Sequence, residues 1–138
     1  MISTTARNVV EHLEEEGGFD RMVAALVTTG VGEVLEGPGP FTLFAPTDAA
    51  FEALEPGAVD WLVTHPGKLA EIMEYHIVPG RLLAEDFRDH GMLPTLEGEP
   101  LRVRSAGGHT HVGGATVFDV DNESGNGVVH VIDRVLVP

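Results

Sequence analysis

The stretch from Gly127 to Pro138 restricts the fold of this chain most, because its apolar residues predict a β-strand with two covered faces. Alternate residues of a strand point to opposite faces. One face carries Val129, Val131, Val135 and Val137, and the other carries Val128, Ile132 and Leu136. A strand with one wet face would alternate apolar and polar residues, so we expect this one to be covered on both sides, by a second sheet or by helices. The dipeptide Asn126-Gly127 before it predicts a tight turn, which makes the strand the return arm of a hairpin.

The polar residues within this stretch, His130, Asp133 and Arg134, need partners, because a buried polar group without one costs about 1–3 kcal/mol. For Asp133 we expect a structural role, with its carboxylate held by backbone N–H groups or by an arginine. Loss of one member of a buried charged pair costs about 3–5 kcal/mol, so replacing Asp133 should destabilise the fold more than an exposed substitution would.

The length of 138 residues fits a single domain spanning residues 1–138, which would bury about two thirds of the surface that the unfolded chain exposes. The absence of cysteine excludes a disulfide framework and thiolate metal sites. We find no run of about 18 apolar residues and no basic and apolar leader after Met1. We therefore expect a soluble chain without direct membrane insertion.

The charge balance is strongly acidic, with 22 Asp and Glu against 8 Lys and Arg and a formal net charge of −14. Nucleic acids and anionic membranes are disfavoured as partners, because both are bound through clustered basic residues, which are few here. Two explanations for the acidity stay open. One is an ordinary acidic, soluble surface, and the other is adaptation to high salt, where charges are strongly screened.

The first part of the chain carries apolar residues at helical spacing. Thr4 or Thr5 is expected to cap the first helix, and Gly17-Gly18 is expected to end it. After a strand over residues 41–46, Thr47 or Asp48 is expected to accept hydrogen bonds from the next helical turn, which is worth about 1 kcal/mol. Further helices are expected near residues 19–30, 58–64 and 68–74.

From Tyr75 the pattern changes to that of a strand, which must end at Pro79 or lie at a sheet edge there, because proline cannot donate to the ladder. Short segments separated by Gly, Pro and Asp follow, and they predict antiparallel strands in a sandwich or a partly open barrel. These segments are Leu82 to Phe87, Leu93 to Leu96, Leu101 to Arg104, His109 to Val112 and Ala115 to Val120.

Three segments of the chain resemble the signature segments of the fasciclin domain: FTLFAPTDAAFEAL from Phe41, YHIVPG from Tyr75 and NGVVHVIDRVLVP from Asn126. The resemblance implies an α+β fold, a wedge-shaped β-sandwich of short strands with several helices packed on one side. It also implies that the first and last of these segments form neighbouring strands. The residues that it marks as a structural signature are Thr47, Asp48, Pro79, Gly80, His130 and Asp133.

The resemblance further implies a non-catalytic adhesion or matrix-binding module, extracellular or at the cell surface, whose partner is a protein or a matrix or polysaccharide component. In some animal members of that family the Tyr-His segment is implicated, with its apolar neighbours, in integrin contact, which would fall here on Tyr75, His76, Ile77 and Val78. The alternative for His76 is a core histidine that is hydrogen-bonded to backbone. The chain has no Arg-Gly-Asp tripeptide.

Metal sites are not predicted, although two patterns resemble fragments of one. His109 and His111 would share one face of a strand, but two ligands do not make a site. Asp119, Asp121 and Glu123 begin like a calcium loop. The pattern then fails, because Ser124 stands where the loop needs glycine and His130 where it needs a bidentate glutamate. Asn122-Glu123-Ser124 is a triplet for N-glycosylation, which matters only in an exported chain.

Catalytic motifs are also missing from the sequence: it has no GxSxG elbow, no cysteine nucleophile, no GxGxxG after a strand and no Walker loop. We therefore expect neither an enzyme nor a cofactor. The main alternative to an adhesion module is a protein that binds a small apolar molecule in a cleft between sheet and helices. A hydrolase, built on a convergent Ser or Asp with His, is the less favoured alternative.

The acidic composition predicts that salt stabilises the fold. Like charges at adjacent or i,i+3 positions, as in Glu14 to Glu16, Glu52 with Glu55 and Glu71 with Glu74, cost a few tenths of a kcal/mol per pair. Raising NaCl from about 0.1 M to about 1 M shortens the Debye length from about 10 Å to about 3 Å. We expect the melting temperature to rise, and to rise less when several of these glutamates are changed to glutamine. A flat or falling melting temperature in NaCl would contradict this expectation, and a sulfate series separates screening from strengthened apolar burial.

Overall fold

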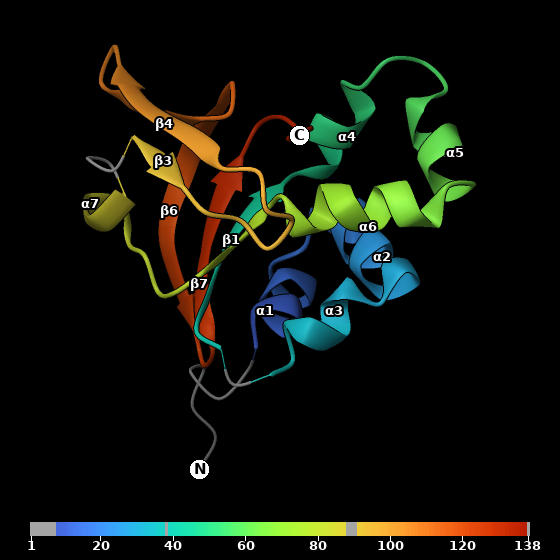
Figure 1. Ribbon diagram of the computed structural model, residues 1–138, viewed down its shortest axis with the longest axis horizontal. Coiled ribbons are helices and arrows are strands. Elements are labelled where there is room, and N and C mark those ends of the chain that lie inside the picture. Colours follow the sequence, from blue (N-terminus) through green and yellow to red (C-terminus); the bar gives the residue numbers. More distant parts are fainter. Residues whose placement is uncertain (1–7, 38, 88–90, 138) are drawn as a thin grey trace.

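The computed structural model describes residues 8–37, 39–87 and 91–137 and shows an α+β fold, in which most of the helices pack against one face of a sheet (Figure 1). No helix among these residues combines the length and the apolar character needed to cross a membrane. The helices are α1 (Val9–Glu16), α2 (Asp20–Thr29), α3 (Val31–Val34), α4 (Asp48–Glu52), α5 (Ala58–Val63), α6 (Pro66–Glu74) and α7 (Ala84–Phe87). The strands are β1 (Phe41–Pro46), β2 (Ile77–Pro79), β3 (Met92–Leu93), β4 (Leu101–Ala106), β5 (His109–Val112), β6 (Ala115–Ser124) and β7 (Gly127–Ile132).

The strands form one seven-stranded sheet in the order β2-β1-β7-β6-β5-β4-β3. β1 runs parallel to β7, and every other neighbouring pair is antiparallel. The predicted hairpin before Gly127 is confirmed, since β6 and β7 pair at Ser124 and Gly127. The first and last signature segments are neighbours, as expected. The expected sandwich of two sheets is not confirmed, because one continuous ladder connects all the strands.

β7 is buried on both faces, as predicted, and it separates two hydrophobic cores. Its residues Val129 and Val131 pack with β1, β2 and the helices in the helix-side core. Ile132 packs in the sheet-side core, whose members come from β1, β2, α7 and the strands β3 to β6. Strands from both ends of the sheet enclose this second core, so the sheet is curled toward a barrel (Figure 1).

The predicted strand from Gly127 to Pro138 is too long, since β7 ends at Ile132. Its partner β1 ends opposite at Pro46, which has no N–H group to continue a ladder. Asp133 and Arg134 are therefore exposed. The apolar alternation still continues beyond the strand, because Leu136 is buried in the sheet-side core.

One predicted helix start and one predicted strand are wrong, each for a local reason. α1 begins at Val9, where Asn8 and Glu11 form a reciprocal capping box; the expected caps Thr4 and Thr5 lie outside the described residues. The segment from Leu82 to Phe87 is not a strand but contains the one-turn helix α7. Asp86 promotes this turn by accepting a hydrogen bond of 2.9 Å from the Leu83 N–H group.

Asn126, at the turn between β6 and β7, connects three distant parts of the chain. Its side-chain oxygen accepts a hydrogen bond of 3.0 Å from the Val9 N–H group at the start of α1. Its amide nitrogen donates to the carbonyl groups of Leu35 and Gly37, which follow α3. The backbone carbonyl of Asn126 also accepts from Phe41 N–H at the start of β1. One buried side chain thus joins the helical layer to the sheet at this end of the molecule.

We expect Asn126→Ala to lower the free energy of unfolding by about 3 kcal/mol, because it leaves an N–H group and two carbonyl groups without their partner in a buried region. Urea unfolding at neutral pH measures this loss. Asn122→Ala is the matched control, because Asn122 is half-buried and its amide makes a 3.1 Å hydrogen bond to Val129 within the same hairpin. Equal losses in the two variants would contradict the role assigned to Asn126.

Candidate functional site

The Tyr-His segment expected to contact a receptor is buried. The exposed fractions are 9% for Tyr75 and 0% for His76, Ile77 and Val78. Tyr75 and Val78 belong to the sheet-side core, whereas Ile77 belongs to the helix-side core. The expectation of a direct contact surface on these four residues is therefore wrong for the folded chain, since a partner cannot reach their side chains while both cores stay intact.

For His76 the structure confirms the other interpretation offered by the sequence, a core histidine that is hydrogen-bonded to backbone. Its Nδ1–H group donates to the Ile72 carbonyl at 2.6 Å, and its Nε2 accepts from the Leu136 N–H group at 2.9 Å. Burial lowers the pKa of His76 from 6.5 to about 4, although the Ile72 carbonyl opposes the shift. The ring is therefore neutral at pH 7, and it fastens the segment after β7 to the end of α6.

His130 makes an equivalent connection inside the curled sheet. Its Nε2–H group donates to the Leu82 carbonyl at 2.8 Å, and its Nδ1 accepts from the Asp121 N–H group at 3.1 Å. The ring stacks on Phe44 and meets the Phe87 ring edge to face. Burial lowers the pKa of His130, against the opposing effects of the Leu82 carbonyl and of Asp121 and Asp119. Both of these buried histidines have both ring nitrogens engaged with backbone, so neither can act as a general base in this conformation.

Other signature residues also form hydrogen bonds between a side chain and the backbone. Thr47 caps α4 by accepting a hydrogen bond of 3.2 Å from the Ala50 N–H group, which confirms the predicted cap. Asp48 caps a different helix, since its carboxylate accepts from the Arg21 N–H group at 2.9 Å, in the first turn of α2. This contact supplies a cap that α2 lacks at its own N-cap residue, Phe19.

Pro79 ends β2 at the edge of the sheet, as predicted. Gly80, which follows it, accepts a hydrogen bond of 2.7 Å from the Thr42 hydroxyl group. Asp133 accepts from the Thr116 N–H group at 2.8 Å, so its carboxylate is held by backbone as expected. The residue is exposed, however, so the expected loss of about 3–5 kcal/mol for a buried charged pair does not apply to it.

The metal-like patterns do not assemble in the structure. The described part of the chain holds no group of three or more His, Asp or Glu side chains that could bind a metal ion. His111 makes a 3.3 Å contact from Nδ1 to the Thr116 hydroxyl group, and His109 is exposed beside the β4–β5 turn. Asp121 has a positive φ of 60° and its carboxylate accepts from Ala84 N–H at 2.8 Å, so it supports α7.

An apolar groove lies among the helices and is the feature best suited to contact with a partner. It has a volume of about 150 Å³. We call it the helix groove, and it is lined by Arg21, Ala24, Ala25 and Thr28 of α2, Phe51 of α4, Val59, Leu62 and Val63 of α5, and Leu69 of α6. None of these residues belongs to a strand, so the groove is not the cleft between sheet and helices that a small-molecule binder was expected to have.

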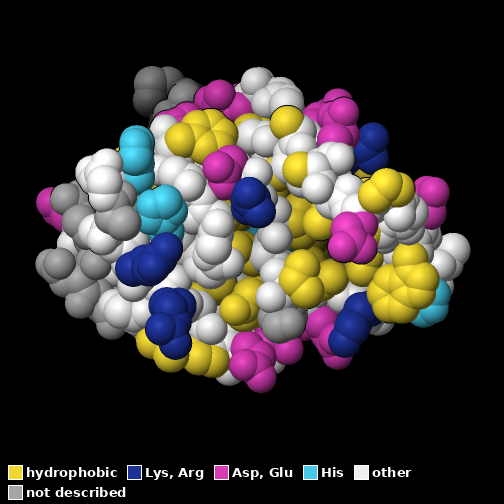
Figure 2. Space-filling view, turned by 90° about the horizontal axis from the view of Figure 1, so that it is seen from above, with side chains coloured by type: hydrophobic (Ala, Val, Ile, Leu, Met, Phe, Trp, Pro, Cys, Tyr) yellow, Lys and Arg dark blue, Asp and Glu magenta, His cyan; other side chains and the backbone are white. Residues whose placement is uncertain are grey.

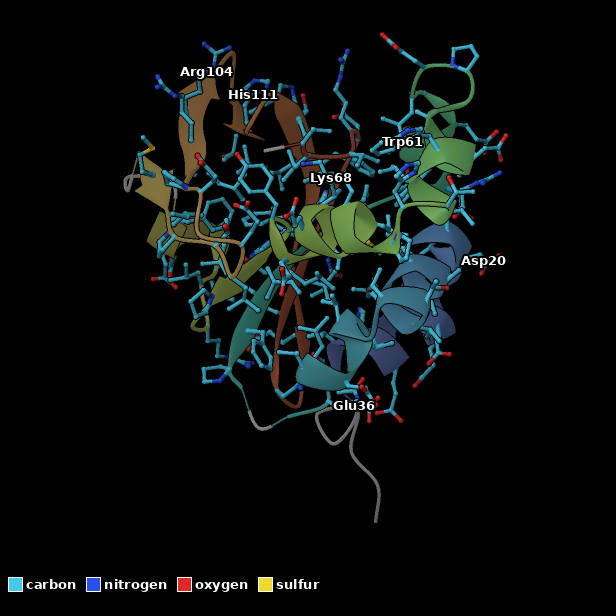
Figure 3. All side chains as sticks on the ribbon, turned by 45° about the vertical axis from the view of Figure 1, so that its right-hand side comes forward. Asp20, Glu36, Trp61, Lys68, Arg104 and His111 are labelled. Carbon is cyan, nitrogen blue, oxygen red and sulfur yellow. The ribbon has the colours of Figure 1, made fainter. Side chains whose placement is uncertain are left out.

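Exposed apolar side chains accompany the helix groove. Val63 in its lining is 59% exposed, and Val27, which precedes the lining residue Thr28 on α2 but is not itself in the lining, is 69% exposed. Trp61 on α5 is 49% exposed, and its ring stacks on His65 at a centroid distance of 3.9 Å. Figure 3 shows Trp61 on the helical side of the molecule, and Figure 2 shows hydrophobic side chains reaching the surface over much of one face. Sequence reasoning did not find this surface, because helical periodicity alone does not show which apolar residues remain uncovered.

Comparison with known proteins gives one consistent family. Residues 17–138 match the family model of the fasciclin domain. The uncharacterized protein sll1735 of Synechocystis sp. is 38% identical over 130 residues, which cover 94% of this chain and 97% of that protein. The transforming growth factor-beta-induced protein ig-h3 of Sus scrofa is 32% identical over 139 residues, which cover 100% of this chain and 20% of that protein.

A solved structure shows the same fold. The FAS1 domain pair from the insect cell adhesion molecule Fasciclin I matches with a TM-score of 0.70, over 88% of this chain and 46% of that chain. The sequence identity is 24%, so this similarity concerns the fold alone.

The lowered pKa values of His76 and His130 predict a fold that is weakened by mild acid. Because the pKa of His76 is lowered to about 4, this histidine is protonated below about pH 6.5 in the unfolded chain but only below about pH 4 in the folded chain. Stability is therefore complete above pH 6.5 and falls between pH 6.5 and 4, by up to about 1.4 kcal/mol per pH unit for one such group. The lowered pKa of His130 acts in the same direction.

We expect His76→Gln to be less stable than the wild type at pH 7 and to lose less stability between pH 7 and pH 5. Urea unfolding at both pH values measures this difference, and His65→Gln is the control because His65 is exposed. The carboxylates are common to all three proteins, so their titration cancels in the comparison. An unchanged pH dependence in His76→Gln would show that His76 is not the source of the acid sensitivity.

Proposed function

Because the chain belongs to the fasciclin domain family, we propose that it is a non-catalytic adhesion module that binds a protein or matrix partner through the helix groove. The solved relative is described as a cell adhesion molecule, and adhesion requires a module outside the cell or on its surface. The proposal therefore includes an extracellular or cell-surface location for this domain.

The observation that carries the proposal is the helix groove with its exposed apolar border. Pockets that enclose drug-sized ligands have volumes of about 300–1,000 Å³, so a groove of about 150 Å³ is too small for one. A groove of this size suits one large apolar side chain of a partner, and such buried anchors carry most of the binding energy of protein interfaces. Exposed Val63 in the lining and exposed Val27, next to the lining residue Thr28 in the chain, supply further apolar contact area.

The engagement of both core histidines with backbone supports a non-catalytic role. A general base needs a ring nitrogen within reach of a substrate proton. His76 and His130 are both fully buried, and each ring nitrogen already bonds to the main chain. Their lowered pKa values follow from this burial, which accounts for the perturbed titration without a catalytic site.

A bead attachment assay tests the proposal. Beads are coated with the domain, and their attachment to cells and matrix of the source organism is counted. We expect wild-type beads to attach, and beads that carry Val27→Asp with Val63→Asp to attach at least about tenfold less, because charges in and beside the lining oppose the burial of an apolar side chain of the partner. The matched control is Phe118→Asp with Val137→Asp, which changes two side chains that are 58% and 63% exposed and lie outside the groove.

Two results would contradict the proposal. Wild-type beads that attach no better than albumin-coated beads would argue against an adhesion module. Equal losses in the groove variant and the control variant would argue against the helix groove as the contact. Thermal melts of both variants verify that each one is folded before the comparison is made.

A further inference from the structure

Basic residues collect at one end of the sheet, although the chain carries a net charge of −14. Arg102, Arg104, His111, Gly113 and Gly114 line an open hollow of about 240 Å³, which we call the basic notch. Figure 3 shows Arg104 and His111 close together at this end of the molecule, and Figure 2 shows Lys or Arg side chains beside His side chains on the face seen from above. The notch lies on β4, β5 and the following turn, whereas the helix groove is built from α2, α4, α5 and α6.

The alternation of residues along β4 places Arg102 and Arg104 on the same face of the strand. Leu101 and Val103 of β4 are buried, so the alternating residues Arg102 and Arg104 share the outer face. Two residues of a strand span about 7 Å, which separates the two side chains at their origin. His111 is the register partner of Arg104 on β5 and therefore lies on the same face.

The guanidinium groups of the notch are exposed and have no side-chain partner among the residues that the structure describes. Neither Arg102 nor Arg104 makes an ion pair or a side-chain hydrogen bond with any residue that the structure describes. By contrast, Arg81 pairs with Glu123 and Lys68 pairs with Glu71. Side by side and without a partner among the described residues, the two arginines present up to ten N–H donors to solvent at one place.

The ring of His111 lines the notch together with the two arginines. Its Nδ1 contacts the Thr116 hydroxyl group at 3.3 Å, which leaves Nε2 as the nitrogen available to the notch. Asp133 binds the backbone N–H of the same Thr116 at 2.8 Å, so its carboxylate is already engaged with main chain. Glycines at 113 and 114 add no side chains to the floor of the notch, and a Cβ at Gly114 would meet only open space.

We propose that the basic notch binds an acidic polysaccharide through the carboxylate or sulfate groups of its sugar units. The planar fork of arginine matches such oxyanions with two parallel hydrogen bonds, and two forks can hold two successive anionic groups. The volume of about 240 Å³ suits a unit smaller than a drug-sized ligand, and the hollow is open, so a polymer can extend beyond it. An acidic peptide fits less well, because none of the five lining residues offers an apolar pocket for a peptide side chain.

This site does not depend on the function proposed for the helix groove. The groove takes an apolar anchor and the notch takes an anion, so substitutions in one should leave the other intact. The high negative charge elsewhere on the chain repels a polyanion only over short range at physiological salt, where the Debye length is about 8 Å. Direct contacts in the notch therefore decide the affinity.

Titration calorimetry at physiological salt tests the proposal with two oligosaccharide probes, a polyuronate fragment that carries carboxylates and a heparin fragment that also carries sulfates. Poly-L-glutamate of similar charge is the peptide probe, and free sulfate is the competitor. We expect an oligosaccharide to bind, and Arg102→Gln with Arg104→Gln to weaken binding about tenfold or more, because charged hydrogen bonds are lost. Which of the two oligosaccharides binds more tightly distinguishes carboxylate from sulfate recognition.

The matched control is Arg21→Gln with Lys68→Gln, which removes the same two charges from the helical side and should change the affinity less than about twofold. Arg102→Lys with Arg104→Lys keeps the charge but removes the planar fork, and we expect an intermediate affinity. Val27→Asp with Val63→Asp should leave oligosaccharide binding unchanged, which separates this result from the test of the helix groove.

Amide chemical shifts give a second readout that needs no variant. We expect the oligosaccharide that binds to shift the amide signals of Arg102 to Arg104 and of His111 to Gly114 in the wild-type chain. Equal losses in the notch and control variants, shifts confined to other elements, or no binding of either oligosaccharide would overturn the proposal. Tighter binding of poly-L-glutamate than of both oligosaccharides would also overturn it and would indicate an acidic protein as the partner.

Discussion

The burial of β7 on both faces is the constraint on which the rest of this structure depends. A strand with no wet face must have one layer of structure on each side, which requires helices against one face and the curled continuation of the sheet against the other. Its interior place between β1 and β6 also means that neither core is complete without it. The single polar side chain inside the strand, His130, is tolerated because both of its ring nitrogens have backbone partners.

The polar residues that first suggest catalysis or metal binding form hydrogen bonds to the main chain instead. His76, His130 and Asn126 each bond to backbone groups far away in the sequence, and each does so where water is excluded. Asp48 does the same at the surface, where it caps a helix other than its own. Because the inside of the molecule is committed to structure in this way, binding is left to exposed surfaces, and the two suited to it differ in chemistry: one is apolar and helical, the other basic and formed by strands.

The sequence predicts what depends on neighbouring residues and fails where distant segments decide. The two apolar faces of the stretch after Gly127 and the Thr47 cap follow from local pattern, and both are confirmed. The end of β7 depends on Pro46 in another strand, so the burial expected for Asp133 was wrong. The role of Asn126 and the pairing of Arg104 with His111 depend on chain topology and strand register, which periodicity does not contain.

The parallel pairing of β1 with β7 has a consequence for how this protein is made. Among the strands that the structure describes, β7 comes last in the sequence, yet it takes an interior position in the sheet beside β1, which comes first. During translation the helices and β1 emerge from the ribosome before β7. The edge of β1 that pairs with β7, and the apolar helix surface that packs against β7, therefore stay uncovered until β7 follows. Exposed strand edges and apolar faces favour association between chains, so the nascent polypeptide is most at risk in this interval. A shortage of protection by chaperones would therefore reduce the yield of this domain more than its final stability suggests.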